Sequence, residues 1–384
     1  MSGSPKTEAG PACRSSACAC GTPTIGVIKL TDEPYRRLRE FLDLFPLGFP
    51  ATDSGVELEI LERLFTPDEA ELAVLLTPFP EEAGVVAARA GLEADVLEAR
   101  LESMAAKGLV FRVRRAGRTL YNAIPFMIGL YEYSVGKVDG ELAALFKEYY
   151  ELAYMDEMGA SGVPGFKVVP IGEHIVDEVA LFPYAALKGA VMEARKISVA
   201  DCICRKEARL TGGGCDRPME TCLSFGAAAE FYIENGIGRE ITASEAIDII
   251  EEADRAGLVH AGTNTVHLSN LCNCCACCCA SMKGITRMGR ERRLYLNALF
   301  EARVDEEECT GCGDCTERCP VGALTLAAAA SVDRDACLGC GLCAGACDVG
   351  AITLRLREDR DEPFGRMLDL GAAILDGKHG NSVP

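Results

Sequence analysis

The chain has 384 residues with 58 acidic and 39 basic side chains, so its formal net charge is -19. This acidity disfavours nucleic acid as a partner and suits docking to a basic patch on a partner protein. The 21 cysteines would indicate disulfides in a secreted protein, but the chain begins without an apolar signal segment, and no stretch approaches the roughly 20 apolar residues of a membrane span. We therefore expect a cytoplasmic protein from an anaerobic setting, with metal-bound thiols and two or three domains.

Both ends of the chain are expected to be irregular. Residues 1–22 are rich in serine, glycine and alanine and predict a flexible tail. The cysteines of this tail could be ligands or a C-x-C metal grip, but no apolar framework surrounds them, which favours spare thiols; they are Cys13, Cys18 and Cys20. Residues 358–384 are charged and then glycine-rich, and predict a C-terminal tail that wraps the surface or frays.

Residues 23–135 are expected to form the first domain. Within it, Thr66-Pro67 predicts the start of a helix with acidic residues in its first turn. A second helix ends at Gly91, and a third, with apolar residues at helical spacing, ends at Gly108. The stretch 109–121 then predicts a β-hairpin. Three helices followed by a hairpin resemble a winged-helix domain.

The charges of this domain bear on DNA binding. Its third helix carries four acidic residues against two basic ones, which would repel phosphates rather than release their counterions. The counter-evidence is four arginines on the hairpin, namely Arg112, Arg114, Arg115 and Arg118. Basic residues on such a hairpin usually lie on an edge exposed to solvent. For this domain, an interaction or scaffolding role is therefore favoured over sequence-specific DNA binding.

Residues 136–300 are expected to form a helical, cysteine-rich domain. Helices predicted over 222–234 and 242–256 would bring two groups of cysteines together, because neither group satisfies its metals alone. Nine of these cysteines are expected to be metal ligands: Cys202, Cys204, Cys215 and Cys222 in the first group, and Cys272, Cys274, Cys275, Cys277 and Cys278 in a dense run. Cys279, the last cysteine of the run, is left unassigned.

Ten cysteines could hold two [4Fe–4S] clusters, using eight thiolates and leaving two. Within the dense run, Cys272, Cys275 and Cys278 have the C-x2-C-x2-C spacing of a cluster-binding run. One solution gives this triad and a remote cysteine to one cluster, and gives Cys274 and Cys277 with two cysteines of the first group to the other. A metallothionein-like nest of thiolates is the alternative for the run.

The last eight cysteines lie within residues 301–357 and repeat one motif. They form two copies of C-x2-C-x2-C-x3-C that start 28 residues apart, at Cys309, Cys312, Cys315 and Cys319 and at Cys337, Cys340, Cys343 and Cys347. A cubane cluster needs four thiolates, and C-x2-C-x2-C places three of them around one face of it. Matching tails at 321–326 and 349–354 predict two pseudo-symmetric halves, each with a short strand. Zinc also takes four cysteines, but two tandem runs favour iron.

This segment resembles the bacterial-type ferredoxin with two [4Fe–4S] clusters. The resemblance implies crossed ligation, with one cluster held by Cys309, Cys312, Cys315 and Cys347 and the other by Cys337, Cys340, Cys343 and Cys319. The glycines of the runs would let backbone N–H groups approach the sulfurs. Asp348 stands where such ferredoxins have a proline after the fourth cysteine, which implies a local effect on potential or solvent access.

About three-quarters of the chain resembles an uncharacterised family of cysteine-rich [4Fe–4S] dicluster proteins of anaerobes. Besides the dense run, the resemblance rests on Cys202-Ile-Cys-Arg205, Cys215-Asp-Arg-Pro218, Glu220-Thr-Cys222 and Gly257-Leu-Val-His260 with Asn264. It implies iron–sulfur chemistry and gives neither a reaction nor a partner.

Three features beside the cysteines also bear on the site. Arg205 could donate hydrogen bonds to cluster sulfur or form a surface salt bridge. His260 and His267 precede the dense run, and packing or capping is favoured over ligation for both. The glycine run at 211–214 lacks the Lys-Ser/Thr of a P-loop and predicts a flexible loop that presents Cys215.

Together these patterns predict an α+β, multi-domain iron–sulfur protein. It would pass electrons between protein redox partners through about four [4Fe–4S] clusters, two in the ferredoxin-like domain and one or two in the central domain, as a carrier or as a subunit of an oxidoreductase. One alternative is an enzyme that reduces a disulfide or another small substrate at a central cluster or thiol site. A second is a cluster-gated regulator that uses the winged helix. No catalytic residue, specific partner or oligomeric state follows from the sequence.

Overall fold

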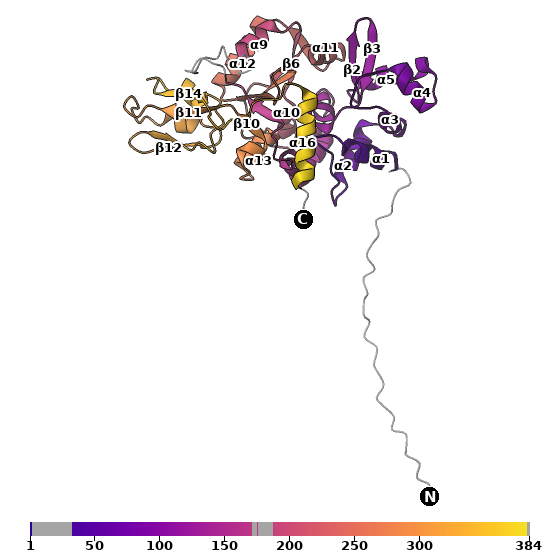
Figure 1. Cartoon of the computed structure of the whole chain (residues 1–384), viewed down its shortest axis with the longest axis horizontal. Helices are drawn as coiled ribbons and strands as arrows, with labels where there is room; N and C mark the ends of the chain where they lie inside the picture. Colours follow the sequence, from indigo (N-terminus) through magenta and orange to yellow (C-terminus); the bar gives the residue numbers. More distant parts are fainter. Residues whose placement is uncertain (2–32, 171–174, 176–186, 382–384) are drawn as a thin grey trace.

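A computed structural model describes residue 1 and residues 33–170, 175 and 187–381. The tail expected over 1–22, with Cys13, Cys18 and Cys20, lies outside the described residues apart from Met1. The described chain mixes helices with sheets, as an α+β protein does. In Figure 1 a mainly helical N-terminal part and the C-terminal β11–β14 part lie at opposite ends, with a sheet between them.

The N-terminal part combines helices with a small antiparallel sheet in the order β1-β3-β2. Its helices and turns are α1 (Glu33–Leu42), α2 (Val56–Leu64), α3 (Pro67–Ala73), α4 (Ala83–Ala90), α5 (Ala94–Ala106), η1 (Phe126–Leu130), α6 (Tyr131–Tyr133), α7 (Gly140–Tyr149), η2 (Tyr150–Tyr154) and α8 (Met155–Gly159). Its strands are β1 (Glu81–Glu82), β2 (Phe111–Arg115) and β3 (Arg118–Asn122). The helices and hairpin expected over 66–122 are confirmed. The side chain of Thr66 caps α3 by accepting from the Glu69 amide, and Gly91 ends α4 with φ of 66°.

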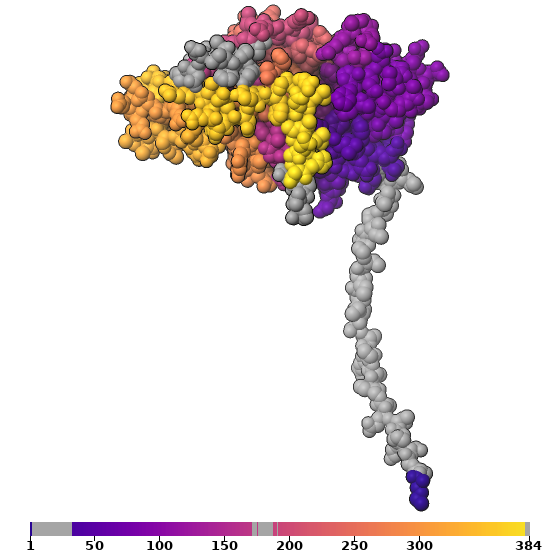
Figure 2. Space-filling view, in the orientation of Figure 1, coloured from indigo at the N-terminus to yellow at the C-terminus, as the bar shows by residue number. Residues whose placement is uncertain are grey.

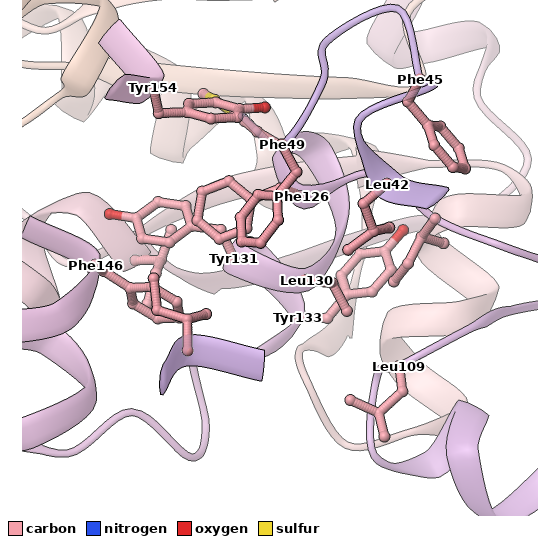
Figure 3. Close-up of a cluster of buried hydrophobic side chains, with 14 of the residues drawn as sticks. Leu42, Phe45, Phe49, Leu109, Phe126, Leu130, Tyr131, Tyr133, Phe146 and Tyr154 are labelled. Atoms are coloured by element: carbon pink, nitrogen blue, oxygen red, sulfur yellow. The ribbon is translucent and has the colours of Figure 1, made fainter. Parts of the chain in front are cut away.

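Aromatic rings form the centre of the main apolar core. Phe126 lies within 6 Å, centroid to centroid, of the rings of Phe49, Tyr131, Phe146 and Tyr154, and Figure 3 shows these side chains gathered between the helices. Aromatic pairs in tilted and edge-on arrangements add to the stabilisation from buried area. This core extends to residues of the central sheet, so the N-terminal and central parts share it.

The central part is built on a sheet, so the prediction of a helical domain is wrong here. Among the described residues the sheet has seven strands in the order β10-β4-β8-β9-β6-β5-β7, namely β10 (Leu296–Ala298), β4 (Phe166–Val168), β8 (Val259–Thr263), β9 (Asn270–Cys274), β6 (Glu220–Phe225), β5 (Ile197–Asp201) and β7 (Arg239–Ile241). The expected helix over 222–234 is in fact the end of β6 followed by α11 (Ala227–Glu234). The strands of this sheet have three to six residues, and two of them contain cysteine, so they lack the length and the alternation that identify a strand in a sequence.

The two faces of this sheet are covered differently. The remaining helices are α9 (Leu187–Glu193), α10 (Ile203–Leu210), α12 (Ala243–Arg255), α13 (Ala280–Thr286) and the short η5 (Arg292–Leu294). Helices α9 and α12 pack on one face, where Leu223 and Leu271 are fully buried. Since neighbouring strand residues point to opposite faces, Cys222 and Cys272 lie on the other face, toward the main core. The helix expected over 242–256 is confirmed as α12, with Thr242 as its N-cap.

The C-terminal part contains two small antiparallel sheets of two strands each. They pair β11 (Phe300–Val304) with β14 (Ile352–Leu356), and β12 (Leu324–Leu326) with β13 (Ala330–Val332). Short helices α14 (Asp314–Arg318) and α15 (Leu342–Gly345) follow the two C-x2-C segments. The closing strands expected over 321–326 and 349–354 are therefore confirmed as β12 and β14.

The segment after β14 crosses the molecule and ends in a helix, α16 (Met367–Asn381). Arg357 donates to the carbonyl of Cys337, and Phe364 pairs with Thr265 of the central part. Leu370 and Ile374 of α16 are buried. Figure 2 shows this segment, in yellow, running over one face of the molecule from the C-terminal sheets to the N-terminal helices. The sequence predicts a tail here that wraps the surface or frays, and the structure has a docked helix. None of the described helices is long and apolar enough to cross a bilayer.

Candidate metal centres

The eight cysteines of the tandem runs form two groups of four. Burial raises the pKa of the Cys315 thiol, and the nearby thiolates that raise it further are Cys312, Cys309 and Cys347. Burial likewise raises the pKa of Cys340, with Cys343, Cys337 and Cys319 as its neighbours. The last cysteine of each run therefore lies beside the other run, as the resemblance to ferredoxins implies.

The residues around these thiols fit cubane clusters. A cavity of about 20 Å³ is lined by Cys319, Cys337, Cys340 and Cys343. Backbone amides already point at sulfur, with Ala323 N 3.2 Å from Cys319 Sγ and Gly339 N 3.4 Å from Cys337 Sγ. Gly339 is required there, because its φ is 64° and a Cβ would lie 2.0 Å from the Phe300 carbonyl oxygen.

The two groups lie at different depths. Cys312 is exposed, and we call its group, with Cys309, Cys315 and Cys347, the outer site. The other group, the inner site, consists of Cys319, Cys337, Cys340 and Cys343. Leu338 and Leu342, beside the inner ligands, belong to the main core that also contains the central sheet. The inner site therefore lies between the outer site and the central part.

The central cysteines separate into two further groups. A cavity of about 50 Å³ next to the sheet has walls that are almost entirely apolar apart from sulfur. Six of the thiols that line it, which define the six-thiol cavity, are Cys202, Cys204, Cys222, Cys272, Cys274 and Cys279. The second group, the four-thiol group, is Cys215, Cys275, Cys277 and Cys278. Cys275 also lines the edge of the cavity.

Local structure decides which group each cysteine of the dense run joins. Cys272 and Cys274 are two residues apart on β9, so they point to the same face and enter the cavity. The next residues form a turn that carries Cys275, Cys277 and Cys278 away from the strand. Cys279 is the N-cap of α13 and returns to the cavity.

This division differs from the one that spacing suggested. Cys272 does not join Cys275 and Cys278, and Cys277 lies with those two rather than with Cys274. The spacing of the run gives Cys279 no place in a cluster, yet this residue lines the six-thiol cavity beside Cys204 and Cys274. Cys279 could have been recognised if the run had been read as a strand followed by the start of a helix. A residue at a helix N-terminus faces the first turn of that helix.

Sulfur–sulfur contacts hold the cavity thiols together. Hydrogen bonds from Cys204 and Cys274 lower the pKa of Cys279 well below that of an ordinary thiol, and the amides of Met282 and Ser281 add to this. A hydrogen bond from Cys204 also lowers the pKa of Cys202. These two side chains are therefore ready to act as thiolate ligands.

Glu132 lies among the residues that line the six-thiol cavity. Burial raises the pKa of its carboxyl to about 8, although it accepts a hydrogen bond from the Gly129 amide at 2.9 Å. The carboxyl therefore keeps its proton at neutral pH. An ionised carboxylate at this position would add to the negative charge of the neighbouring thiolates.

Arg205 lies between the two central groups. It has no exposed surface, so the surface salt bridge that sequence analysis left open is excluded. Its Nη1 donates to the Asn273 carbonyl at 2.9 Å and lies 4.0 Å from Cys275 Sγ. Its Nη2 donates to the Thr221 hydroxyl. The guanidinium thus supplies N–H groups and positive charge to the buried sulfurs.

The other predicted features have structural roles. His260 Nδ1 lies 2.6 Å from Oδ1 of Asn273, the residue between Cys272 and Cys274. The imidazole therefore packs against this asparagine rather than among the thiols. The carbonyl of His267 accepts from Thr265. The glycine loop after α10 presents Cys215 to the dense run as expected, with Cys215 Sγ 3.9 Å from Cys275 Sγ.

The comparison with protein families identifies the C-terminal part. The family described as "4Fe-4S binding domain" matches residues 302–325 and 330–353. Residues 302–353 form a ferredoxin-like domain for two [4Fe–4S] clusters. The matched repeats contain the outer and inner ligands, so the chain is an iron–sulfur protein. No curated protein and no solved structure matches the chain.

Loss of one outer ligand tests the separation of the groups. We expect Cys312→Ser to remove about four iron atoms and leave the remaining iron in place, because the other groups have complete ligand sets of their own. Iron and acid-labile sulfide are measured after anaerobic purification. Thr310→Ser, an exposed substitution in the same loop, is the control. Near-total loss of iron in Cys312→Ser would show that the groups are not independent.

Proposed function

We propose that the protein transfers electrons between redox partners through clusters at the outer site, the inner site and the six-thiol cavity. The observation that carries this proposal is the ordered depth of the three thiol groups. The outer site has an exposed ligand, the inner site is buried next to it, and the inner site shares the main core with the cavity. Cys315 of the outer site is close enough to Cys343 of the inner site to raise its pKa.

Each cluster, when bound, supplies a centre that gains or loses one electron. The chain provides the conditions for this exchange. Leu338 and Leu342 exclude water between the inner site and the main core. Arg205 offsets the negative charge of the cavity thiols Cys202 and Cys274, and Glu132 stays neutral beside them. The amides that point at sulfur in the ferredoxin-like domain raise the potential of a bound cluster.

The surface around the outer site favours a basic partner. Exposed acidic residues surround its ligands in the sequence, and they are Asp305, Glu306, Glu307, Glu308, Asp314, Glu317 and Asp348. Complementary charge speeds diffusional encounter between proteins. An electron-transfer partner with a basic patch would therefore dock at the exposed end of the ferredoxin-like domain.

Charge reversal at this surface tests the docking proposal. We expect the rate of electron transfer from the reduced protein to a basic c-type cytochrome to fall with rising ionic strength. At low salt, Glu306→Lys with Glu307→Lys should slow it by about tenfold. Asp53→Lys with Glu59→Lys, at exposed positions of the N-terminal part, should leave the rate nearly unchanged. Stopped-flow absorbance gives the rates, and equal slowing by both pairs would contradict docking at the outer site.

The six-thiol cavity is proposed as the central cluster site. Six thiols that face one apolar cavity would be costly as free thiolates, and bound iron relieves that cost. Six is also more than the four thiolates that a cubane needs. We therefore expect an iron–sulfur cluster here and leave its nuclearity to measurement.

Cys279 provides the test of this site. The purified protein should contain more iron than the roughly eight atoms of the ferredoxin-like domain. Cys279→Ser should lose the excess and keep those eight atoms, because its thiol lies among those of Cys204 and Cys274. Ser281→Ala, which changes a buried wall residue but no thiol, should retain all the iron. A wild-type protein with eight iron atoms would contradict a cluster in the cavity.

The N-terminal part is proposed as a winged-helix-like scaffold. Its element order and its sheet order β1-β3-β2 support this assignment. The hairpin packs on the central part, with the rings of Phe111 and Phe231 4.8 Å apart. Three of its four arginines are engaged by carboxylates, since Arg112 and Arg114 contact Glu102 and Glu234, and Arg118 contacts Glu82. These contacts favour docking within the chain over DNA binding, and so weigh against a cluster-gated regulator.

A second candidate function is the reduction of a small apolar substrate. An apolar pocket of about 450 Å³ lies beside the six-thiol cavity, and Met127 and Phe166 line both. Leu370 and Ile374 of α16 form part of its wall. A disulfide held there would take two electrons and two protons as its S–S bond breaks and two thiols form. Glu132 keeps a proton at neutral pH in the neighbouring cavity.

Filling the pocket tests this second function. With a chemically reduced donor, an aromatic disulfide should be turned over by the wild type and at least tenfold more slowly by Ala228→Phe, whose ring would occupy the pocket. The iron content should not change, because no thiol is touched. Ala228→Ser keeps the pocket open and serves as the control. If the wild type does not reduce the disulfide, this candidate fails while the electron-transfer proposal stands.

A further inference from the structure

The four-thiol group has a geometry unlike that of the other thiol groups. The sulfur atoms of Cys215, Cys275, Cys277 and Cys278 all lie within 4.8 Å of one another. Three of the six distances are 3.9 Å between Cys215 and Cys275, 3.9 Å between Cys215 and Cys278, and 3.7 Å between Cys277 and Cys278. The sulfurs therefore form the corners of a compact tetrahedron.

The size of this tetrahedron distinguishes a single ion from a cluster. Zinc–sulfur bonds of about 2.3 Å at tetrahedral angles place the sulfurs about 3.8 Å apart. In a cubane each thiolate binds a different iron atom, so the thiolates lie farther apart. In the described part of the chain, the four-thiol group alone is this compact, and the outer and inner ligands of the ferredoxin-like domain are not.

We propose that Cys215, Cys275, Cys277 and Cys278 hold one Zn²⁺ ion in a closed tetrahedral site. Each cysteine binds as a thiolate, so the four thiols release their protons as the ion enters. Four thiolates leave no open position, which is the pattern of a structural zinc site rather than a catalytic one. The zinc site is separate from the clusters of the proposed function and does not depend on them.

The surroundings of the four sulfurs match the charge of such a site. Four thiolates and one Zn²⁺ carry two net negative charges, and two guanidinium groups face them. Arg217 Nη1 lies 3.7 Å from Cys277 Sγ, and Arg205 Nη1 lies 4.0 Å from Cys275 Sγ. N–H groups directed at ligand sulfur are the usual outer partners of metal-bound thiolates.

The backbone of the ligands is also held in place. Arg209 donates to the Cys215 carbonyl at 3.0 Å, and Arg287 donates to the Cys277 carbonyl at 3.1 Å. Ala208, Ala253 and Leu258 pack around the ligands and form a small separate core. Cys275 and Cys278 are thus buried among apolar side chains, whereas Cys215 and Cys277 are half-buried and have their carbonyls fixed by the two arginines.

The ion would join two segments that are far apart in the sequence. Cys215 lies in the loop after α10, and the other three ligands lie in the turn between β9 and α13, about 60 residues later. Because the same turn lies between Cys274 and Cys279, zinc would also hold those two thiols in position at the six-thiol cavity.

Metal analysis and X-ray absorption of the full chain test the proposal. Protein that is made in medium containing both zinc and iron, and is then purified anaerobically, should contain one zinc ion per chain. Its zinc K-edge spectrum should show four sulfur neighbours at about 2.3 Å. Absence of zinc, or iron bound by four sulfurs without sulfide at this site, would overturn the proposal.

Two substitutions of the partly exposed ligand Cys277 complete the test, together with one control variant. Cys277→His should keep the zinc, with three sulfur neighbours and one nitrogen, because imidazole is also a zinc ligand. Cys277→Ala should lose zinc or bind it at least tenfold more weakly against a chelator. Cys312→Ser should keep the zinc and lose iron only. Loss of about four iron atoms from Cys277→His, with no zinc in the wild type, would identify a cubane instead.

Discussion

A guanidinium buried among thiols is the interaction on which the central part depends. Arg205 has no exposed surface and reaches both β9 and the residue before Cys222. A buried cation is costly unless opposite charge surrounds it, and buried thiolates are equally costly without positive charge nearby. The positive charge of Arg205 and the negative charge of the thiolates therefore stabilise each other. The planar fork of arginine also donates in several directions at once, so one side chain connects the six-thiol cavity, the four-thiol group and the strands that carry them.

The ferredoxin-like domain could be predicted from the sequence because its ligands are encoded locally. Three cysteines of each run follow within seven residues, glycines permit the turns, and the repeat of 28 residues shows two equivalent halves. The same holds for the helices and hairpin of the N-terminal part, where Thr66 caps the start of α3 and Gly91 caps the end of α4. The contact of the hairpin with Phe231 could not be predicted, because it depends on packing between distant segments.

The central cysteines show where local reasoning ends. The spacing of Cys272, Cys275 and Cys278 matches a cluster-binding run, but that motif applies when the run forms a loop that wraps one cluster. Here the run begins on a strand, where alternate residues share a face, and it ends at the start of a helix. The seven-stranded sheet could not be predicted because its strands are short and because the pairs β4–β8 and β6–β9 join residues far apart in the sequence. Cys279 was missed for the same reason, since α13 returns it to the cavity.

The segment after β14 has a mechanical consequence. Arg357 attaches it to the ferredoxin-like domain, Phe364 pairs with the central part, and α16 buries Leu370 and Ile374. In redox proteins whose cluster domain swings on a tether, the timing of the swing sets the rate of delivery. Here the chain on both sides of the ferredoxin-like domain is packed against the rest of the molecule, and such packing favours a fixed separation between the thiol groups. The speed of such a molecule would be governed by encounters at its surface and not by motion within it.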